Sequence, residues 1–385
     1  MAIYLAVKEI WRNRTRYFLF SLVIALITTL VLFIAALAVG LADANKQYLD
    51  KLNTDLLAFQ DNVDLQITTS QIGWSKLNDI RRVEGIADIG AIGYSRGTLV
   101  FEDGRESVDV SLIGVEAGRP GAPSVIGGRG LRSNRGNEVV IDENAVRQAG
   151  LAVGDEIVIK VIQGTKEEFY SLRVVGTAEA QQYLYAPSIF VPFQTWDRIR
   201  PQAVRGGTAG REQAANMVAI RLENGINLNT AALQIEAQVS DLQVVDKPTA
   251  IEAIPGYSVQ QSTLNTQRSF TLLIGLLVIG GFFQIQTLQK VPQIGVLKAI
   301  GASNKTVAVS VVSQITIITL VGVAIGSLVT LLFSAVMPDA VPVVFDPQAI
   351  VLQIIGLLLI GPLGGLVAVR LTTRIEPLTA LGVSS

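Results

Sequence analysis

Residues 17–42 read YFLFSLVIALITTLVLFIAALAVGLA, a run of 26 residues without a charged side chain. At a rise of about 1.5 Å per residue, a helix of this length covers about 39 Å, whereas the hydrocarbon core of a membrane is about 30 Å thick. The run can therefore cross a membrane with some tilt. The alternative is a cleaved signal peptide, because Ala36-Leu37-Ala38 resembles a processing site. The apolar run is too long for that, since the apolar core of a signal peptide spans only about 7–15 residues.

Three further uncharged runs follow much later in the chain, at residues 269–289, 306–338 and 347–369. A single Lys or Arg at the centre of a membrane helix costs about 2.5–3.5 kcal/mol on insertion. Four runs this clean therefore predict four transmembrane helices. Buried helices of a soluble protein are the alternative, and the length of the runs weighs against them.

The charges that flank the runs predict the orientation of the chain. One set of ends is basic, with Lys8, Arg12, Arg14, Arg16, Lys290, Lys298, Lys305, Arg370 and Arg374. The opposite ends are mixed or acidic, with Asp43, Lys46, Asp50, Asp339 and Asp346. Basic flanks stay in the cytoplasm. We therefore expect a multi-pass protein of the cell (inner) membrane, with both termini cytoplasmic and the long insertion outside.

The predicted fold is an α-helical membrane protein with four transmembrane helices and a mixed α/β extracytoplasmic domain inserted between the first and second helices. The expected segments are an interfacial amphipathic helix (1–16), the first span (17–42), the outer domain with its stalk (43–268), the second span (269–289), a cytoplasmic coupling loop (290–305), the third span (306–338), an outer loop (339–348), the fourth span (349–369) and a cytoplasmic tail (370–385).

Composition excludes several classes of function. Charged residues make up 16% of the 385 residues, against about 25% in ordinary soluble domains, and the net charge is −1. The lack of a basic excess argues against nucleic acid as a partner. The chain has no Cys and no His, which removes disulfides, thiol catalysis, Zn sites of the usual kind and His-dependent acid–base chemistry.

The insertion itself has the pattern of a folded α/β domain. Residues 97–115 alternate apolar and polar side chains around Asp103-Gly104, which predicts a β-hairpin. The expected elements that follow are a strand and a short helix ended by Gly150 (138–154), two strands (155–162 and 169–175), a Gly-rich polar loop (201–213) and a helix followed by a strand (226–245).

Residues 2–13 place Ile3, Val7, Ile10 and Trp11 along one helical face, which predicts a helix lying on the inner leaflet. Small residues recur in the later spans, as in Gly322-x-x-x-Gly326 and Gly280-Gly281. Small residues let membrane helices approach closely, either within one chain or between two copies. Dimerisation is more plausible for the first two spans, which flank the outer domain.

No chemistry of catalysis is visible in the sequence. The spans carry no acid or base, and no Gly-x-x-x-x-Gly-Lys-Ser/Thr phosphate loop occurs anywhere. We therefore expect a membrane permease subunit without its own ATPase site, rather than an enzyme, and energy for transport has to come from another chain.

The link between the second and third spans, VPQIGVLKAIGASNKTV at residues 291–307, suits a docking helix. Its apolar strip consists of Ile294, Leu297, Ala299 and Ile300; Lys298 faces another side and Gly301 ends the helix. A short amphipathic helix held between two spans can dock into a groove on a partner. A solvated connector is an equally open alternative on these residues alone.

The part IGVLKAIGASNKTV of this link closely resembles the cytoplasmic loop of the FtsX/MacB superfamily of ABC permeases, whose pattern is roughly E-I-G-I-L-K-A-I-G-A. NEVVIDENAVRQAGLAVGDEIVI and YSLRVVGTAEA are similar to the core of that family's outer domain. The resemblance implies a permease that pairs with a second copy of itself and with two copies of a cytoplasmic ABC ATPase, which binds the ATP. It also implies that the link touches the ATPase, although Gln293 stands where many members have Glu.

Four segments of the membrane part resemble the haem-efflux subgroup of this superfamily: KEIWRNRTRYFLF, VLFIAALAVGLADAN, FFQIQTLQKVPQIGVLKAIG and RIEPLTALG. This resemblance implies a permease that exports haem from the membrane to the outside. Haem would be the cargo, and no cofactor would be bound permanently.

Candidate haem contacts follow from the same resemblance and from the absence of His and Cys, which leaves Tyr, Met and carboxylates as iron ligands. Tyr257 and Tyr183 match tyrosines of the subgroup, and Tyr257 is the candidate iron ligand. Tyr48 and Glu252 are further candidates, and Arg268 or Lys46 could pair with the propionates. Each has an ordinary alternative: Tyr257 as an interfacial anchor, Tyr183 in core packing and Arg268 as a marker of the membrane edge.

Two other functions remain open. The same fold could export or extract another amphipathic cargo, such as a lipid, lipoprotein, peptide or antibiotic. A member of a different class would use the same ATP-driven motion for transmembrane signalling to an extracellular partner, as FtsX does.

Overall fold

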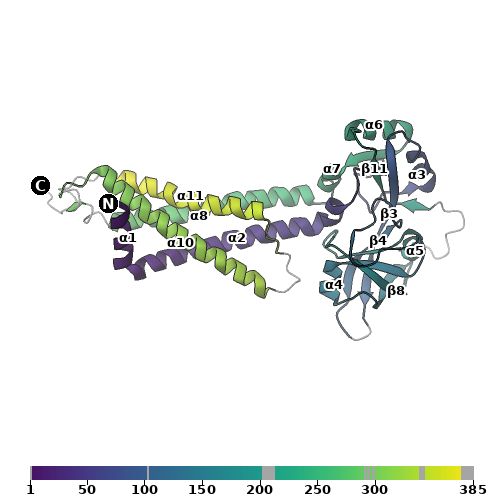
Figure 1. Ribbon diagram of the computed structural model, residues 1–385, viewed down its shortest axis with the longest axis horizontal. Coiled ribbons are helices and arrows are strands. Elements are labelled where there is room, and N and C mark those ends of the chain that lie inside the picture. The colour runs from purple at the N-terminus through teal and green to yellow at the C-terminus, as the bar shows by residue number, and fades with distance from the viewer. Residues whose placement is uncertain are drawn as a thin grey trace. The chain divides into compact units, whose positions relative to one another are not determined.

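The computed structural model describes residues 2–101, 104–201, 213–289, 292, 295–296, 300–337 and 343–373. The chain divides into two compact units (Figure 1). One is helical and combines residues 1–40 with residues 262–385; the other is the continuous segment 41–261. The α/β outer domain expected from the sequence is the second unit.

The helical unit is built from α1 (Ala2–Arg12), α2 (Arg14–Lys51), α8 (Tyr257–Gln289), α10 (Asn304–Val336) and α11 (Pro347–Thr373), with α2 and α8 continuing into the other unit. Helix α2 runs beyond both ends of the uncharged run at 17–42. By length and composition, α2 and residues Lys305–Val336 are able to cross a membrane, and Ile350–Leu363 is a shorter apolar helix, within the residues described. The count of four spans therefore stays a prediction.

Glycines let α10 lie directly on α2. A Cβ at Gly322 would lie 2.7 Å from the Ile24 side chain, and one at Gly326 would lie 2.6 Å from the Ala25 carbonyl oxygen. The Thr29 hydroxyl, half-buried at this contact, donates to the Gly326 carbonyl over 3.1 Å. The Gly-x-x-x-Gly pair thus packs two helices of the same chain, which is the first of the two uses that the sequence left open.

Helix α1 packs against α10, and the division of its side chains into buried and exposed ones differs from the prediction. Ala6 is buried and Ile10 packs into the helical core, whereas Val7 and Trp11 are exposed. The sequence placed Ile10 on the same face as Val7 and Trp11. The prediction did not include the contact with α10. A helix that packs on another helix buries part of its apolar face in that contact, and only the rest stays exposed.

The outer unit contains a ten-stranded sheet and short helices. Its strands are β1 (Leu56–Gln60), β2 (Ile72–Gly73), β3 (Ile86–Val100), β4 (Val108–Val115), β5 (Val125–Gly128), β6 (Glu138–Asp142), β7 (Glu156–Gln163), β8 (Lys166–Ala178), β9 (Ser188–Pro192), β10 (Ala214–Ala215), β11 (Met217–Leu222) and β12 (Leu242–Asp246). Its short helices are α3 (Trp74–Ile80), α4 (Glu143–Ala149), α5 (Phe193–Ile199), α6 (Leu228–Gln238) and α7 (Lys247–Glu252).

The large sheet has the order β12-β1-β11-β3-β4-β9-β6-β8-β5, and β7 pairs with both β3 and β8. Most neighbours are antiparallel, but β4 pairs with β9 and β6 with β8 in parallel. Strands β2 and β10 form a separate small sheet. The long strand β3 therefore belongs to both halves of the unit, since it pairs with β11 in one and with β4 and β7 in the other.

The sheet is buried on both faces, as the alternation along β1 shows. Leu56 and Ala58 belong to one hydrophobic core, and Leu57 and Phe59 to the other. Side chains of successive residues point to opposite faces of a strand. A strand that is covered on both sides therefore reads as a continuous apolar run, which is why LLAF carries no polar alternation.

Several local expectations are confirmed. Strands β3 and β4 form the expected antiparallel hairpin, although Asp103 of its turn lies outside the described residues. Helix α4 is capped by Asp142, whose carboxylate accepts the Ala145 N–H over 2.7 Å, and ends at Gly150 in the left-handed conformation (φ 62°). The Gly-rich loop falls almost entirely outside the described residues.

The indole of Trp196 rests on two glycines that face each other across the sheet. Gly93 of β3 and Gly114 of β4 are register partners, and a Cβ on either would overlap the Trp196 side chain. The indole N–H donates to Ser95 Oγ over 3.1 Å, and the ring packs beside Phe193 with centroids 5.4 Å apart. This contact holds α5 flat against the centre of the sheet.

Gly114→Ala should destabilise the protein by about 1–3 kcal/mol, because the added methyl group overpacks a site with no free volume. Gly130→Ala is a matched control, since its Cβ would meet only a Val125 methyl group at 3.8 Å. Chemical denaturation followed by tryptophan fluorescence measures both. Equal stability of the two variants would contradict the close seat of Trp196.

Candidate cargo and coupling sites

The aromatic rings of Tyr48 and Tyr183 are in contact. Tyr48 comes from the last turns of α2 and Tyr183 from the loop between β8 and β9, and their ring centroids are 5.8 Å apart in an edge-to-face arrangement. Tyr94 of β3 packs on Tyr183 at 5.3 Å, and Phe190 of β9 packs on Tyr48 at 5.9 Å. Two of the expected cargo contacts are thus parts of one aromatic cluster.

Main-chain hydrogen bonds clamp this loop to α2. The Tyr48 N–H donates to the Gln182 carbonyl over 3.0 Å, and the Tyr185 N–H donates to the Ala44 carbonyl over 3.1 Å. Lys51 Nζ lies 3.2 Å from a carboxylate oxygen of Glu179 at the start of the loop. Because two residues of the helix are bridged to two residues of the loop, the outer end of α2 cannot shift without moving the loop.

The cluster is closed to solvent. Tyr48 is 0% and Tyr183 3% exposed, and the hydroxyls of Tyr48 and Tyr94 have no hydrogen-bond partner among the described residues. Burial, and then the nearby Tyr94 ring, raise the pKa of the Tyr183 hydroxyl above its ordinary value near 10. A tyrosine binds ferric iron as the phenolate, so this environment opposes ligation by Tyr183. Contact of either ring with cargo requires the core to open.

Tyr257 lies at the edge of the same core and is accessible. It opens α8, is half-buried against the cluster, and its hydroxyl accepts a hydrogen bond from Gln261 Nε2 over 3.1 Å. Glu252, at the end of α7, is exposed. Among the four expected cargo contacts whose side chains are described, Tyr257 and Glu252 are the ones that solvent reaches.

Arg268 and Lys46 were the candidates for the propionates. The Arg268 side chain lies outside the described residues. Lys46 is half-buried and pairs with Asp43 one turn earlier, with 3.7 Å between Nζ and Oδ1. An ion pair this long between side chains of one helix is weak, so Lys46 could be drawn to another anion at small cost.

Tyr185 is a residue that the sequence analysis missed. It is 54% exposed, and its hydroxyl donates to Gln260 Oε1 of α8 over 3.0 Å. Leu184 and Tyr185 both have positive φ (50° and 65°), which is strained for residues with a side chain and turns Tyr185 outward where Tyr183 points inward. The one visible signal was the second aromatic residue in YLY; the strained backbone cannot be read from sequence.

The expected coupling residues are only partly described. Ile294, Leu297, Lys298 and Ala299 lie outside the described residues. The Ile300 N–H donates to the Val296 carbonyl over 3.1 Å, and Gly301 follows with φ 98°. Ile300 is 79% exposed, which leaves an apolar side chain in solvent. Ser303 then caps α10 by accepting the Thr306 N–H over 3.2 Å.

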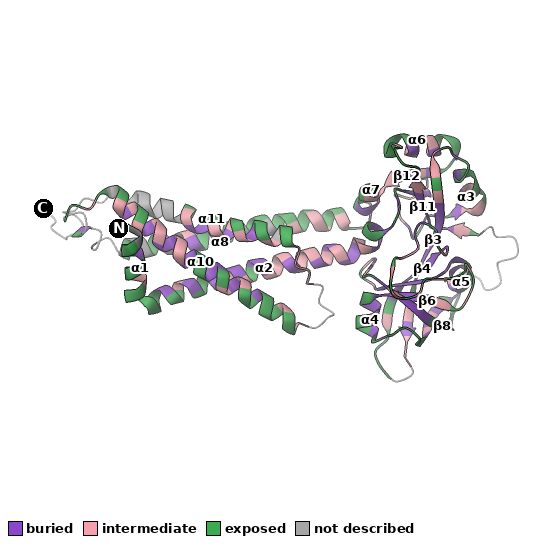
Figure 2. Cartoon of the chain, in the orientation of Figure 1, coloured by how far each residue is buried: buried purple, intermediate pink, exposed green. Residues whose placement is uncertain are grey.

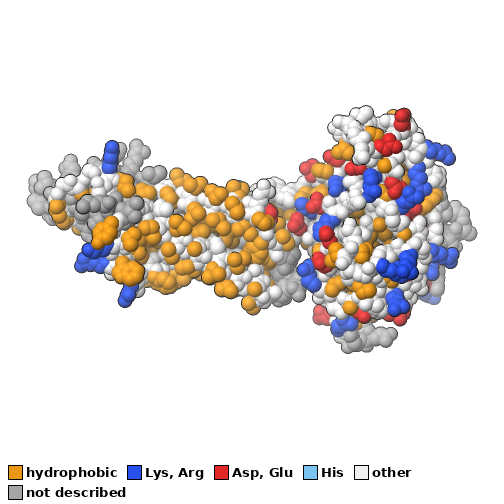
Figure 3. Space-filling view, viewed as in Figure 1, with side chains coloured by type: hydrophobic (Ala, Val, Ile, Leu, Met, Phe, Trp, Pro, Cys, Tyr) orange, Lys and Arg blue, Asp and Glu red, His pale blue; other side chains and the backbone are white. Residues whose placement is uncertain are grey.

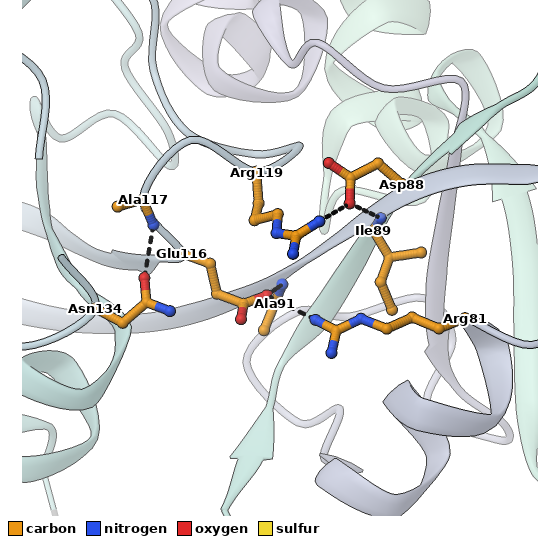
Figure 4. A network of polar contacts seen from close by, with 8 residues as sticks. All are labelled: Arg81, Asp88, Ile89, Ala91, Glu116, Ala117, Arg119 and Asn134. Carbon is orange, nitrogen blue, oxygen red and sulfur yellow. Dashed lines mark hydrogen bonds and ion pairs between the residues drawn. The ribbon is translucent and has the colours of Figure 1, made fainter. Parts of the chain in front are cut away.

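A polar network holds the loop after β4 (Figure 4). The buried Glu116 carboxylate accepts the Ala91 N–H over 2.9 Å and lies 3.6 Å from Arg81 Nη2. The network is completed by Arg119 with Asp88, which also accepts the Ile89 N–H, and by Asn134, which accepts the Ala117 N–H. Its groups satisfy one another, so the network fixes a loop and offers no reactive group.

A shallow pocket of about 430 Å³ opens elsewhere on the outer unit, lined by Arg129, Glu138 and Arg173 among others. Arg129 binds Glu138 through both guanidinium nitrogens, and this hydrogen bonding lowers the pKa of the Glu138 carboxyl. The pocket contains none of the expected site residues. No group of three or more metal-binding side chains occurs within the described part of the chain.

Comparison with known families decides the class of protein. A model of the MacB-like periplasmic core domain matches residues 17–238, more than half of the chain, and a model of the FtsX-like permease C-terminal domain matches residues 269–377. This chain belongs to the FtsX-like permeases with a MacB-like periplasmic core. It is a membrane permease of the ABC transporter class, and most of its α/β unit, residues 41–261, lies within the region that matches the MacB-like periplasmic core.

Individual relatives agree with this assignment. The hemin transport system permease protein HrtB of Staphylococcus haemolyticus is 26% identical over 378 residues, which cover 98% of this chain and 99% of that protein. HrtB of Staphylococcus epidermidis is 25% identical over the same lengths. The macrolide export ATP-binding/permease protein MacB of Escherichia coli is 24% identical over 260 residues, 65% of this chain but only 39% of MacB.

A solved structure with a similar outer domain is the periplasmic region of MacB from Actinobacillus actinomycetemcomitans. It is 16% identical, covers 53% of this chain and 94% of that one, and superposes with a TM-score of 0.37. At this TM-score, no structural detail transfers to the permease.

Tyr183→Phe should make stability less sensitive to alkaline pH. Because the pKa of Tyr183 is raised in the folded protein, the unfolded chain loses this proton near pH 10 and the folded chain only at higher pH. The contribution of Tyr183 to the free energy of unfolding is therefore fully present below pH 10 and is lost as the pH rises above 10. Between pH 8 and pH 11, the free energy of unfolding of the wild type should fall by up to about 1.4 kcal/mol more than that of the variant. Denaturant midpoints at the two pH values measure this, with Tyr185→Phe, an exposed tyrosine, expected to follow the wild type. Parallel losses in all three proteins would contradict the closed cluster.

Proposed function

We propose that this permease is the membrane subunit of an ATP-driven efflux system that carries haem from the membrane to the outside. The observation that carries the proposal is the similarity to hemin transport permeases over 98% of this chain and 99% of theirs. The similarity to MacB covers less of the chain and favours an antibiotic as the second candidate cargo.

ATP is proposed to act on a separate cytoplasmic ATPase, of which two copies join the permease. The relatives that match over their whole length are named permease proteins, whereas MacB, whose name includes ATP binding, extends well beyond the matched region. The ATPase would dock on the link at 294–301. The exposed Ile300 supports this, because an apolar side chain in solvent suits a groove on a partner.

Four crossings with both termini in the cytoplasm are proposed for α2, α8, α10 and α11. On the helical unit, hydrophobic side chains cover the visible surface between its ends, and Lys and Arg gather near α1 (Figure 3). Large apolar side chains are exposed along each of the four helices, for example Leu26, Leu277, Leu332 and Leu359. Such a surface is stable only in contact with lipid or with another membrane helix.

A second copy of the chain is proposed to pack against α8. Among the residues of known burial between 262 and 289, only Gly275 and Ile279 are buried, and the visible part of α8 is largely coloured as exposed or intermediate (Figure 2). Gly281, one turn after the exposed Leu277, has no atom within 4 Å of an added Cβ. A helix exposed on most sides with an open glycine leaves room for close approach of a second α8.

Leu277→Cys should form a disulfide-linked dimer in membranes under mild oxidation, because the two α8 helices of the dimer would face each other there. The chain has no natural Cys, so the product reports this contact alone. Leu331→Cys on α10 is the matched control, since it is similarly exposed but lies on a helix that is not proposed to meet the second copy. Cross-linking of the control and not of Leu277→Cys would place the dimer interface elsewhere.

Haem is proposed to bind where Tyr257, Tyr185 and Glu252 present their side chains. The planar apolar ring needs an aromatic surface, and the iron needs an oxygen ligand because the chain has no His or Cys. Tyr257 and Tyr185 are both accessible and are joined to neighbouring residues of α8, Gln261 and Gln260. Closure of the ATPases would move the spans, and the clamp between α2 and the loop at 179–187 would carry that motion to the cluster beneath Tyr257.

Titration of the purified permease with ferric haem should shift the haem absorption spectrum, and Tyr257→Phe should weaken binding by about tenfold or more through loss of the iron ligand. Tyr170→Phe, in β8 and remote in sequence from α8, is the matched control. Haem should also stimulate ATP hydrolysis by the complex reconstituted with its ATPase. Stimulation by a macrolide and not by haem would overturn the cargo and keep the ABC permease.

A further inference from the structure

The basic side chains of α1 are exposed, whereas its one acidic side chain, Glu9, points toward α10. Glu9 is the only acidic residue among the first 42 residues, which also hold Lys8, Arg12, Arg14 and Arg16. Glu9 Oε2 accepts a hydrogen bond from Gln314 Nε2 of α10 over 2.6 Å, and Oε1 accepts one from the Tyr17 hydroxyl over 3.3 Å. Because Gln314 and Tyr17 are buried, this carboxylate faces the bundle and does not offset the charge on the outer side.

The outer side of α1 combines cations with aromatic rings. Tyr4, Val7 and Trp11 follow at helical spacing and are exposed, Trp11 to 78%. Lys8 lies on the same stripe, with Nζ 5.8 Å from the centroid of the Tyr4 ring. Exposed Trp and Tyr are the residues that prefer the boundary between headgroups and acyl chains, and a Lys beside them reaches the phosphates.

Lys8, Arg12 and Arg14 are exposed, and no ion pair holds them within the part of the chain that the structure describes. Arg16 is engaged differently, since it donates to Gln289 of α8 and stacks on the Phe20 ring. These three exposed cations lie within a few residues of the exposed Trp11, and the local acid is turned away from them. Such a surface is complementary to acidic headgroups rather than to zwitterionic ones.

The geometry points to a binding surface for anionic phospholipid on α1 and the first residue of α2, made by Lys8, Arg12 and Arg14 together with the exposed Trp11. The Glu9–Gln314–Tyr17 contacts orient this surface, because they fix which side of α1 faces the bundle. The bound phospholipid would belong to the leaflet at which the proposed topology places α1. Each basic residue near an anionic surface is expected to favour it about fivefold, so the preference should be large.

The test is quenching of Trp11 fluorescence by brominated lipids, with the full-length protein in bilayers of phosphatidylcholine and phosphatidylglycerol. In each measurement only one of the two lipids is brominated. The fluorescence of the Trp11→Phe variant, which comes from Trp74 and Trp196, is subtracted from that of the wild type. The wild type should be quenched several-fold more strongly, per mole of lipid, by brominated phosphatidylglycerol. The variant Lys8→Gln/Arg12→Gln/Arg14→Gln should bring the ratio close to one. The matched control Arg132→Gln/Arg135→Gln/Arg173→Gln changes the same charge on the outer unit and should keep the wild-type ratio.

Equal quenching by the two lipids in the wild type, or a preference that survives removal of the three cations, would overturn the inference. Quenching no greater than in Trp11→Phe would show that α1 does not lie at a membrane. Both lipids are present in both leaflets of these bilayers, so the result is independent of orientation. Failure of the lipid preference therefore leaves the proposed topology and cargo untouched, and failure of the topology leaves the lipid result readable.

Discussion

Exclusion of charge from lipid-facing helices is the constraint from which the helical unit follows. A helix in hydrocarbon cannot hydrate an ionised side chain, so charges are confined to the ends and buried polar groups have to be paired between helices. Several contacts of this helical unit join α1 or α2 to α10, among them Glu9 with Gln314, Thr29 with the Gly326 carbonyl, and the close seat of Gly322 and Gly326 on α2. Helix α10 is thereby held as the partner of the amino-terminal helices, whereas few of the described side chains of α8 are buried.

Helix α2 is the element shared by the two units. Within the helical unit it is gripped by the glycines of α10, and within the outer unit its last turns are clamped by the loop at 179–187. Both contacts involve main-chain atoms at close range, which resist sliding better than side chains that can change rotamer. The clamp also explains the strained Leu184 and Tyr185, whose positive φ angles are the cost of bringing the loop back to the helix.

The tyrosines illustrate why residue type alone does not identify a binding site. Tyr183 and Tyr185 are two positions apart, yet one is sealed in a core that raises its pKa and the other is exposed beside α8. Cargo can contact only a side chain that it can reach. On that criterion the accessible pair, Tyr257 and Tyr185, is the better candidate, and Tyr48 and Tyr183 are better understood as the packing that fixes the clamp.

Much of the architecture was readable from the sequence. Uncharged runs predicted α2 and α10, and local turn and capping chemistry predicted the hairpin of β3 with β4 and the helix from Asp142 to Gly150, because these signals act over a few residues. The order of strands, the seating of Trp196 on Gly93 and Gly114, the inward turn of Glu9 and the opposite fates of Tyr183 and Tyr185 were decided by tertiary structure alone. They depend on which surfaces meet across long stretches of chain, and a one-dimensional pattern records the composition of each surface but not its partner.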